Sequence, residues 1–136
     1  MADQIRRVDY FYVEVPDKPG EGVRVLAALK EAGIDLLNFT AFPTGNGKAQ
    51  IDLVTQNADA LTRAAKTAGL TLSGRKQAFF VQGQNRVGAA AESLRKLSDA
   101  GVNIRAANGS AGQGGFGMIV WVAPSDVAVA ARALGV

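Results

Sequence analysis

Apolar and polar positions follow one order along the chain, and that order occurs twice. Tyr10–Val15 and Ala78–Gly83 are rich in aromatic and β-branched residues, which is typical of strands. Each strand is followed by apolar residues at spacings of three and four, which predict an amphipathic helix. Gly33 and Gly101 are expected to end these two helices, because glycine readily adopts the positive φ found there.

Two more strands and a second helix follow in each half. A glycine-bearing turn separates the strands, "TGNGK" in the first half and "GSAGQGGFG" in the second. The second helix is expected behind Asn57 or Ser125, both residue types that cap helix N-termini. In the first half a fourth strand is expected at Leu70–Lys76. The strands around the turns are expected at Ile34–Phe42, Ala49–Thr55, Val102–Asn108 and Met118–Ala123.

The two halves are copies of one repeat. When the chain is aligned with itself at an offset of half its 136 residues, no gap is needed, and Phe11, for example, meets Phe79. The order β-α-β-β-α predicts an α+β fold of two tandem ferredoxin-like repeats, each an antiparallel sheet with helices on one face. We expect repeat 1 at residues 1–76 and repeat 2 at residues 77–136.

The second copy has no fourth strand of its own. The same offset aligns residues 2–9 with residues 70–77, and both segments continue directly into the first strand of a repeat. We therefore expect strands shared between the repeats, with residues 2–9 completing the sheet of repeat 2. The alternative is a frayed N-terminus beside an open sheet edge, and exposed edges invite aggregation.

Composition argues against catalysis. The chain has no cysteine and no histidine, which removes thiolate chemistry, the commonest general base and most zinc ligands. Acid–base chemistry would fall on Glu14, Asp17 or Asp52, and none is paired with a second carboxylate at a telling spacing. We expect no enzymatic activity, no cofactor and no metal site. Without a signal peptide or a long apolar run, we expect a cytoplasmic protein with no membrane partner.

The loops before the first helix of each repeat have the composition of an anion site. Asp17 stands three residues before Gly20 in "PDKPG", and Asn85 stands three before Gly88 in "QNRVG". A helix N-terminus offers unpaired N–H groups and partial positive charge to a carboxylate, while Asp17 or Asn85 could hold an ammonium group. Together these groups would suit an α-amino acid. The alternative, which spacing alone favours, is that Asp17 and Asn85 form Asx turns that cap the helices.

These residues together resemble the ACT domain family of small ligand-sensing modules. The resemblance covers nearly the whole chain, as a tandem pair without an attached enzyme domain. The second copy departs from the family pattern at Val87, where the loop proline should be. The matching residues are Asp17, Pro19-Gly20, Leu26, Leu29, Gly33-Ile34 and Asp35, and in the second copy Asn85, Gly88, Leu94, Leu97, Gly101-Val102 and Asn103.

The resemblance implies a regulatory protein that binds an amino acid at the first loop, against a neighbouring ACT unit. Asp17, Lys18 and Gly20, with the N–H groups of Glu21 and Gly22, would hold its amino and carboxylate groups. Its side chain would lie toward Asn38 and Thr40. Asn85 and Gly88 would form a weaker or diverged equivalent.

Two other functions are open. The segment "GGFGMIVW", Gly114 to Trp121, resembles an RNA-recognition motif, and Phe80 and Phe116 could share one sheet face for stacking. However, Gly114 and Met118 stand where that motif has a basic and an aromatic residue, so we do not expect nucleic acid as a partner. The third function is an assembly adaptor without a ligand.

A homodimer is expected from the strands themselves. Phe11–Val13 and Phe79–Val81 carry apolar residues on both faces, and the helices cover only one face of each sheet. The other face must meet apolar surface, either of the other repeat or of a second chain.

Overall fold

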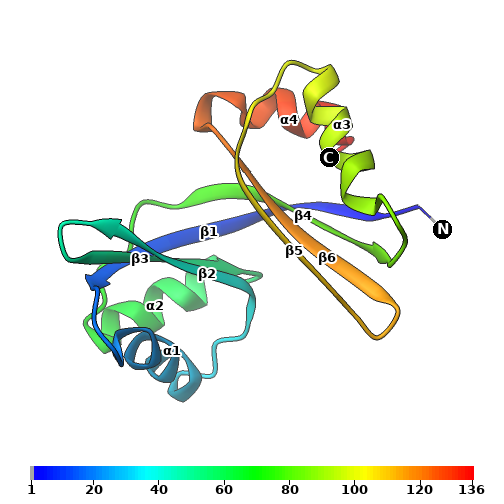
Figure 1. The fold of residues 1–136 in the computed structure, drawn as a ribbon. Coiled ribbons are helices and arrows are strands. Elements are labelled where there is room, and N and C mark those ends of the chain that lie inside the picture. The colour runs from blue at the N-terminus through cyan, green and yellow to red at the C-terminus, as the bar shows by residue number, and fades with distance from the viewer. Residues whose placement is uncertain (1) are drawn as a thin grey trace. The chain divides into compact units, whose positions relative to one another are not determined.

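The computed structural model describes residues 2–136 and confirms the predicted α+β fold with ferredoxin-like repeats. Six strands and four helices are present in this part of the chain (Figure 1). None of these helices is both long and apolar enough to cross a membrane. The elements are β1 (Gln4–Pro16), α1 (Glu21–Glu31), β2 (Leu36–Gly45), β3 (Lys48–Thr55), α2 (Ala58–Ala68), β4 (Lys76–Gln84), α3 (Ala89–Asp99), β5 (Ile104–Gly112), β6 (Gly115–Val122) and α4 (Val127–Leu134).

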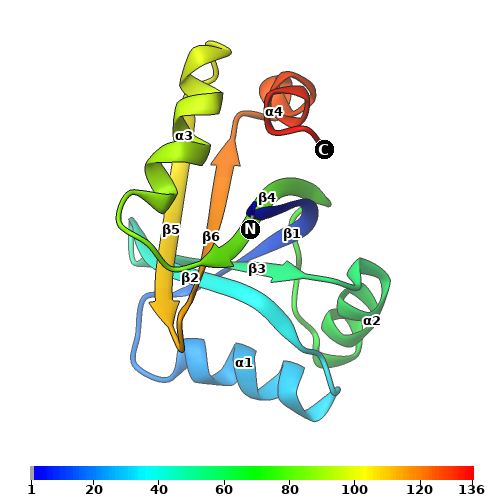
Figure 2. The ribbon, with the colours of Figure 1, turned by 90° about the vertical axis from the view of Figure 1, so that its right-hand side faces the viewer.

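The chain divides into two compact units. The first unit contains residues 9–76, and the second contains residues 77–136 together with the N-terminal segment up to Val8. In the first unit β3 pairs antiparallel with β1 and β2, and α1 and α2 lie on one side of these strands (Figure 1). In the second unit β6 pairs antiparallel with β4 and β5, and α3 and α4 lie on one side (Figures 1 and 2).

Strand β1 belongs to both units. Ile5, near its start, packs against the core of the second unit, whereas Phe11, Val13 and Val15 are buried in the core of the first. Alternate residues of a strand point to opposite faces, so this single long strand can supply apolar side chains to two cores in turn. The N-terminal segment thus contributes to the second sheet, as the repeat pattern predicted.

The predicted fourth strand of the first repeat is wrong before Lys76. Leu70–Arg75 forms no regular strand. Ser73 nevertheless ties this segment to β1: its N–H donates to the Tyr12 carbonyl at 2.8 Å, and its Oγ accepts from the Tyr12 N–H at 2.9 Å. The serine hydroxyl takes the place of the backbone carbonyl that a regular strand would offer to the Tyr12 N–H.

The predicted helix ends are partly confirmed. Asn57 caps α2, since its Oδ1 accepts from the Ala60 N–H at 3.0 Å, and Gly33 and Gly101 have φ of 71° and 74°. The cap predicted at Ser125 is wrong. Ser125 lies inside a short 3-10 turn, Pro124–Asp126, and α4 begins only at Val127. Proline fixes a helical φ at the start of this turn, which places the capping position beyond Ser125.

Both faces of the second sheet carry apolar residues of low exposure. Phe79, Val81 and Val120 lie in the core beneath α3 and α4. Ile119 and Trp121 alternate with the core residues of β6, so they face away from the helices, yet they are 0% and 5% exposed. The homodimer stays a prediction.

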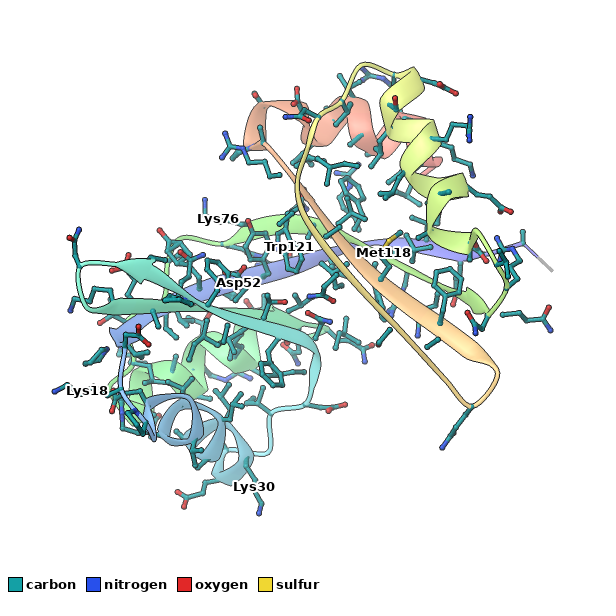
Figure 3. The ribbon with its side chains drawn as sticks, viewed as in Figure 1. Lys18, Lys30, Asp52, Lys76, Met118 and Trp121 are labelled. Carbon is teal, nitrogen blue, oxygen red and sulfur yellow. The ribbon has the colours of Figure 1, made fainter. Side chains whose placement is uncertain are left out.

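Asp52 on β3 is the buried carboxylate of the first sheet (Figure 3). It faces away from the helices, is 7% exposed and accepts a hydrogen bond from Gln50 Nε2 at 2.9 Å. Burial raises the pKa of this carboxyl above its ordinary value of 3.8, although the Gln50 hydrogen bond opposes the shift. The charged form is therefore disfavoured in the folded protein.

We expect Asp52→Asn to stabilise the protein at neutral pH. Because folding raises the pKa of Asp52, its contribution to stability falls as the pH rises from 3.8 through the folded pKa. Asparagine does not ionise, so the variant avoids this loss. The gain should be about 1 kcal/mol at pH 7 and should vanish near pH 3, where both side chains are neutral. Calorimetric melting at both pH values measures it. A variant that is less stable at pH 7 would show that the carboxylate has a favourable partner.

Candidate functional site

The loop before α1 gathers five of the predicted site residues at one helix end. Gly20 is the N-cap residue with a φ of 90°, and no side chain caps the helix. The Asp17 N–H donates to Gly47 O at 2.9 Å, but in the described part of the chain its carboxylate makes no hydrogen bond. Asp17 therefore does not cap the helix. The residues at this helix end are Asp17, Lys18, Gly20, Glu21 and Gly22, with Lys18 labelled in Figure 3.

Asn38 and Thr40 do not join this loop. They pair with Val54 and Asp52 on β3 and lie on the sheet face away from the helices, where Thr40 Oγ1 donates to Asn38 Oδ1 at 3.3 Å. Phe39, between them, faces the helices opposite Leu53. One small ligand at the mouth of α1 would thus meet Phe39 rather than Asn38 and Thr40.

The second repeat builds the same loop without the proline. Gly88 is the N-cap of α3 with a φ of 82° and again no side-chain cap. The Asn85 N–H donates to Gly114 O at 2.8 Å and the Ala89 N–H to Arg86 O at 3.2 Å, matching the bonds of Asp17 and Glu21 in the first loop. Val87 in place of the proline therefore still allows hydrogen bonds of this kind at both ends of the loop.

A groove of about 530 Å³ opens beside this second loop, between α3, β5 and β6. We call it the α3–β5 groove. On β5, Ala107, Gly109 and Ala111 pair with Val120, Met118 and Phe116 and share the helix-covered face with them; Met118 is labelled in Figure 3. The lining residues are Asn85, Arg86, Gly88, Ala89, Ala90, Ala91, Leu94, Ala107, Asn108, Gly109, Ser110, Ala111, Phe116 and Met118.

The groove exists because its edge strand carries small residues. The repeat alignment places Phe39, Ala41 and Pro43 of the first unit where the second has Ala107, Gly109 and Ala111. A phenyl ring in place of the Ala107 methyl would fill the space between strand and helix. The small residues are visible in the sequence as the segment "AANGSAG", although the sequence pattern predicts a hairpin turn from Gly109 on. All of that segment lies in β5, and the turn itself is centred on Gln113 and Gly114.

The chemistry of the groove is apolar with a polar mouth. Leu94, Phe116 and Met118 provide apolar side chains, and Arg86 is the one charged residue among those that line it. At the mouth, the N–H groups of Ala90 and Ala91 in the first turn of α3 have no intrahelical acceptor. The partial positive charge of a helix N-terminus lies there as well. Such a site offers N–H donors to an anion and apolar contact to whatever extends from it.

The aromatic platform expected for RNA binding is absent from the described sheet. Phe80 pairs with Ile119 and lies on the face away from the helices, where it is 8% exposed. Phe116 pairs with Gly83 on the opposite, helix-covered face. Two rings on opposite faces cannot stack successive bases, so the possibility that Phe80 and Phe116 share one sheet face for stacking is contradicted.

Comparison with solved structures identifies the fold. Protein BT0572 from Bacteroides thetaiotaomicron has a TM-score of 0.76 at 17% identity, covering 98% of this chain and 88% of that one. The ligand-free regulatory subunit of aspartate kinase from Thermus thermophilus has a TM-score of 0.68 at 16% identity, with 98% and 94% covered. The fold is ACT-like. A putative C-terminal regulatory domain of aspartate kinase from Porphyromonas gingivalis agrees, with a TM-score of 0.58, 12% identity and 98% and 95% covered.

These similarities concern structure alone. No protein-family model matches the sequence, and no curated protein matches it. At identities below one fifth, the shared fold does not carry ligand or partner with it. The function of this ACT-like chain therefore has to be argued from its own groove.

Proposed function

We propose that the protein is a regulatory sensor that binds a small α-amino acid with an apolar side chain in the α3–β5 groove. The observation that carries this proposal is the groove itself, which joins an uncapped helix N-terminus to an apolar cavity of ligand size. The ligand carboxylate would accept hydrogen bonds from the N–H groups of Ala90 and Ala91. The side-chain amide oxygen of Asn85 would accept from its ammonium group.

The ligand side chain would lie against Leu94, Phe116 and Met118. No carboxylate lines the groove, and the guanidinium of Arg86 is already bound by Asp3 and Glu92. A charged ligand side chain would therefore lose its hydration without gaining a partner, which costs free energy. An apolar side chain gains from burial instead.

The first loop would be a weaker site of the same kind. Asp17, Lys18, Gly20, Glu21 and Gly22 would hold the same polar groups, but Phe39 and Pro43 leave less room for a side chain. Asn38 and Thr40, on the other sheet face, take no part in this version of the site.

A regulatory role is supported by the structures that share the fold, several of which are named as regulatory subunits or domains of aspartate kinase. The α3–β5 groove lies along β5, whose residues Ala107, Gly109 and Ala111 are exposed. We place a second copy of the chain along this strand, so that a homodimer would close the groove at an ACT–ACT interface.

Titration calorimetry with each standard amino acid tests the proposal. We expect leucine, methionine or phenylalanine to bind and lysine or glutamate not to bind. Asn85→Ala should weaken binding by roughly 1.5–3 kcal/mol, the scale of a hydrogen bond to a charged group. Asp17→Ala changes the matching residue of the first repeat and is the control, with little effect expected on the groove.

The result also separates the alternatives. If Asp17→Ala abolishes binding and Asn85→Ala does not, the ligand lies at the first loop. If no amino acid binds to the wild type, the sensor proposal is wrong and an assembly adaptor becomes the better account.

A further inference from the structure

Arg86 joins the wall of the groove to the start of the chain. Its guanidinium donates to both carboxylate oxygens of Asp3, at 3.0 Å each, and also to Glu92 Oε2 and the Gln84 carbonyl oxygen. It lies over the ring of Phe116, 5.9 Å from the centroid. Arg86 and Phe116 both line the groove, whereas Asp3 does not. The Arg86 guanidinium, which is the charged group at the groove, is thus held in place by Asp3, a residue outside the groove.

Asp3 is the better anchored of the two carboxylate partners. Its side chain is 9% exposed and makes a bidentate pair, whereas the Glu92 side chain is 61% exposed. Arg86 lowers the pKa of Asp3, so the carboxylate stays charged at neutral pH. A bidentate arginine–carboxylate pair fixes the orientation of the guanidinium as well as its position.

Gly83 makes room for this pair. A Cβ at position 83 would lie 2.1 Å from Asp3 Oδ1 and 3.1 Å from the Phe116 ring. Glycine is therefore required by the position of the Asp3 carboxylate rather than by backbone conformation. Any side chain at position 83 would push Asp3 away from Arg86.

The first repeat lacks each part of this arrangement. The repeat alignment places Thr71, Val15 and Lys48 where the second repeat has Asp3, Gly83 and Phe116, and Lys18 stands in place of Arg86. The first repeat also has Phe39 in place of Ala107. The residues of the Asp3–Arg86 pair thus occur in the repeat that carries the α3–β5 groove and are replaced by other residue types in the first repeat.

We propose that Asp3 is a specificity-determining residue of the α3–β5 groove, although it does not touch the ligand. By holding the Arg86 guanidinium over Phe116, it keeps an uncompensated positive charge out of the groove, so that an apolar side chain is accepted. This inference rests on the proposed function for its ligand. Without Asp3, Arg86 keeps only the Gln84 carbonyl and Glu92, whose side chain is 61% exposed. The guanidinium can then turn into the groove, where it favours an acidic side chain.

Asp3→Asn tests this in the full-length chain. We expect the affinity for leucine, used as the apolar probe, to fall relative to glutamate by about tenfold, the factor that one charge-assisted hydrogen bond supplies. Gly83→Ala should do the same without changing any charge, because it displaces the Asp3 carboxylate. Adding Arg86→Gln to Asp3→Asn should restore the preference for leucine, which a merely structural role of Asp3 does not predict.

Asp9→Asn is the matched control. It breaks a similar pair, Asp9 with Arg75 at 2.7 Å, in the first unit and should leave the leucine-to-glutamate ratio unchanged. If Asp3→Asn and Gly83→Ala both fold and keep the wild-type ratio, the inference is overturned.

A second measurement keeps this result separate from the proposed function. If wild-type protein binds neither probe, the amide NMR signals of Ala107, Gly109 and Ala111 decide in the ligand-free protein. They should shift in Asp3→Asn and return when Arg86→Gln is added, since only the wild-type pair keeps the guanidinium out of the groove. Signals that do not move would overturn the inference even though the sensor proposal had failed on its own.

Discussion

Ala107→Phe is expected to weaken amino-acid binding strongly while leaving the fold intact. The substitution gives β5 the residue that the first repeat has at the same position, Phe39, and its ring would occupy the groove against Leu94. Ala107 is exposed on a strand, where an aromatic residue is well tolerated. The ligand side chain would lose its burial, worth about 1.5–3 kcal/mol, so the affinity should fall by roughly ten- to a hundredfold.

Phe39→Ala provides the reciprocal variant. It opens the corresponding space in the first unit and should leave the affinity of the α3–β5 groove unchanged. Calorimetry and thermal melting of both variants, with and without leucine, measure binding and folding separately. An Ala107→Phe protein that melts normally and binds leucine with wild-type affinity would exclude the groove as the binding site.

The elements could be predicted because the periodicity of apolar residues determines them directly. Phe11, Val13 and Val15 alternate along β1, and Val25 and Leu29 are spaced as on one face of a helix; the structure buries all five. The gapless internal repeat supported most of these predictions with a second copy of the same pattern. The helix ends at Asn57 and Gly33 could also be predicted, because a side-chain cap and a positive φ depend on few residues.

The face on which a residue lies was harder to predict, because it depends on strand register. From the sequence alone, Phe80 and Phe116 could share one face of the sheet. The pairing of Phe80 with Ile119 and of Gly83 with Phe116 puts them on opposite faces. A register shift between Leu36 and Asn38 likewise interrupts the pairing of β2, and beyond it Asn38 and Thr40 face away from the helices. An irregularity of one residue exchanges the faces of every later side chain, and no local sequence feature announces it.

The groove was missed for a different reason. The loop that carries the proline has the stronger sequence pattern, whereas the space for a ligand depends on the size of the side chains on the neighbouring strand. Comparing Phe39 with Ala107 across the repeat alignment would have indicated which loop has room beside it. The Asp3–Arg86 pair joins residues far apart in the sequence, and they meet because the segment at the start of β1 belongs to the second unit.

Deleting residues 2–7 is expected to cause the largest loss of stability. These residues begin β1, and the compact unit that contains β4, β5 and β6 also includes them. Ile5 packs against the core of that unit, Arg6 lies 5.3 Å from the centroid of the Phe80 ring, and Asp3 binds Arg86. Removing a strand end forfeits several hydrogen bonds at about 1 kcal/mol each, besides the burial of Ile5.

The loss should be several kcal/mol, a large part of the 5–15 kcal/mol that stabilises a typical domain. Urea unfolding followed by circular dichroism measures it, and Asp3→Asn in the intact chain shows how much is due to the ion pair alone. Appending a copy of residues 2–7 behind Val136 should recover part of the loss if the missing feature is a strand rather than a particular chain end. A deletion variant with the unfolding midpoint of the wild type would mean that the segment adds nothing to the second sheet, and Asp3 would then have no fixed position from which to hold Arg86.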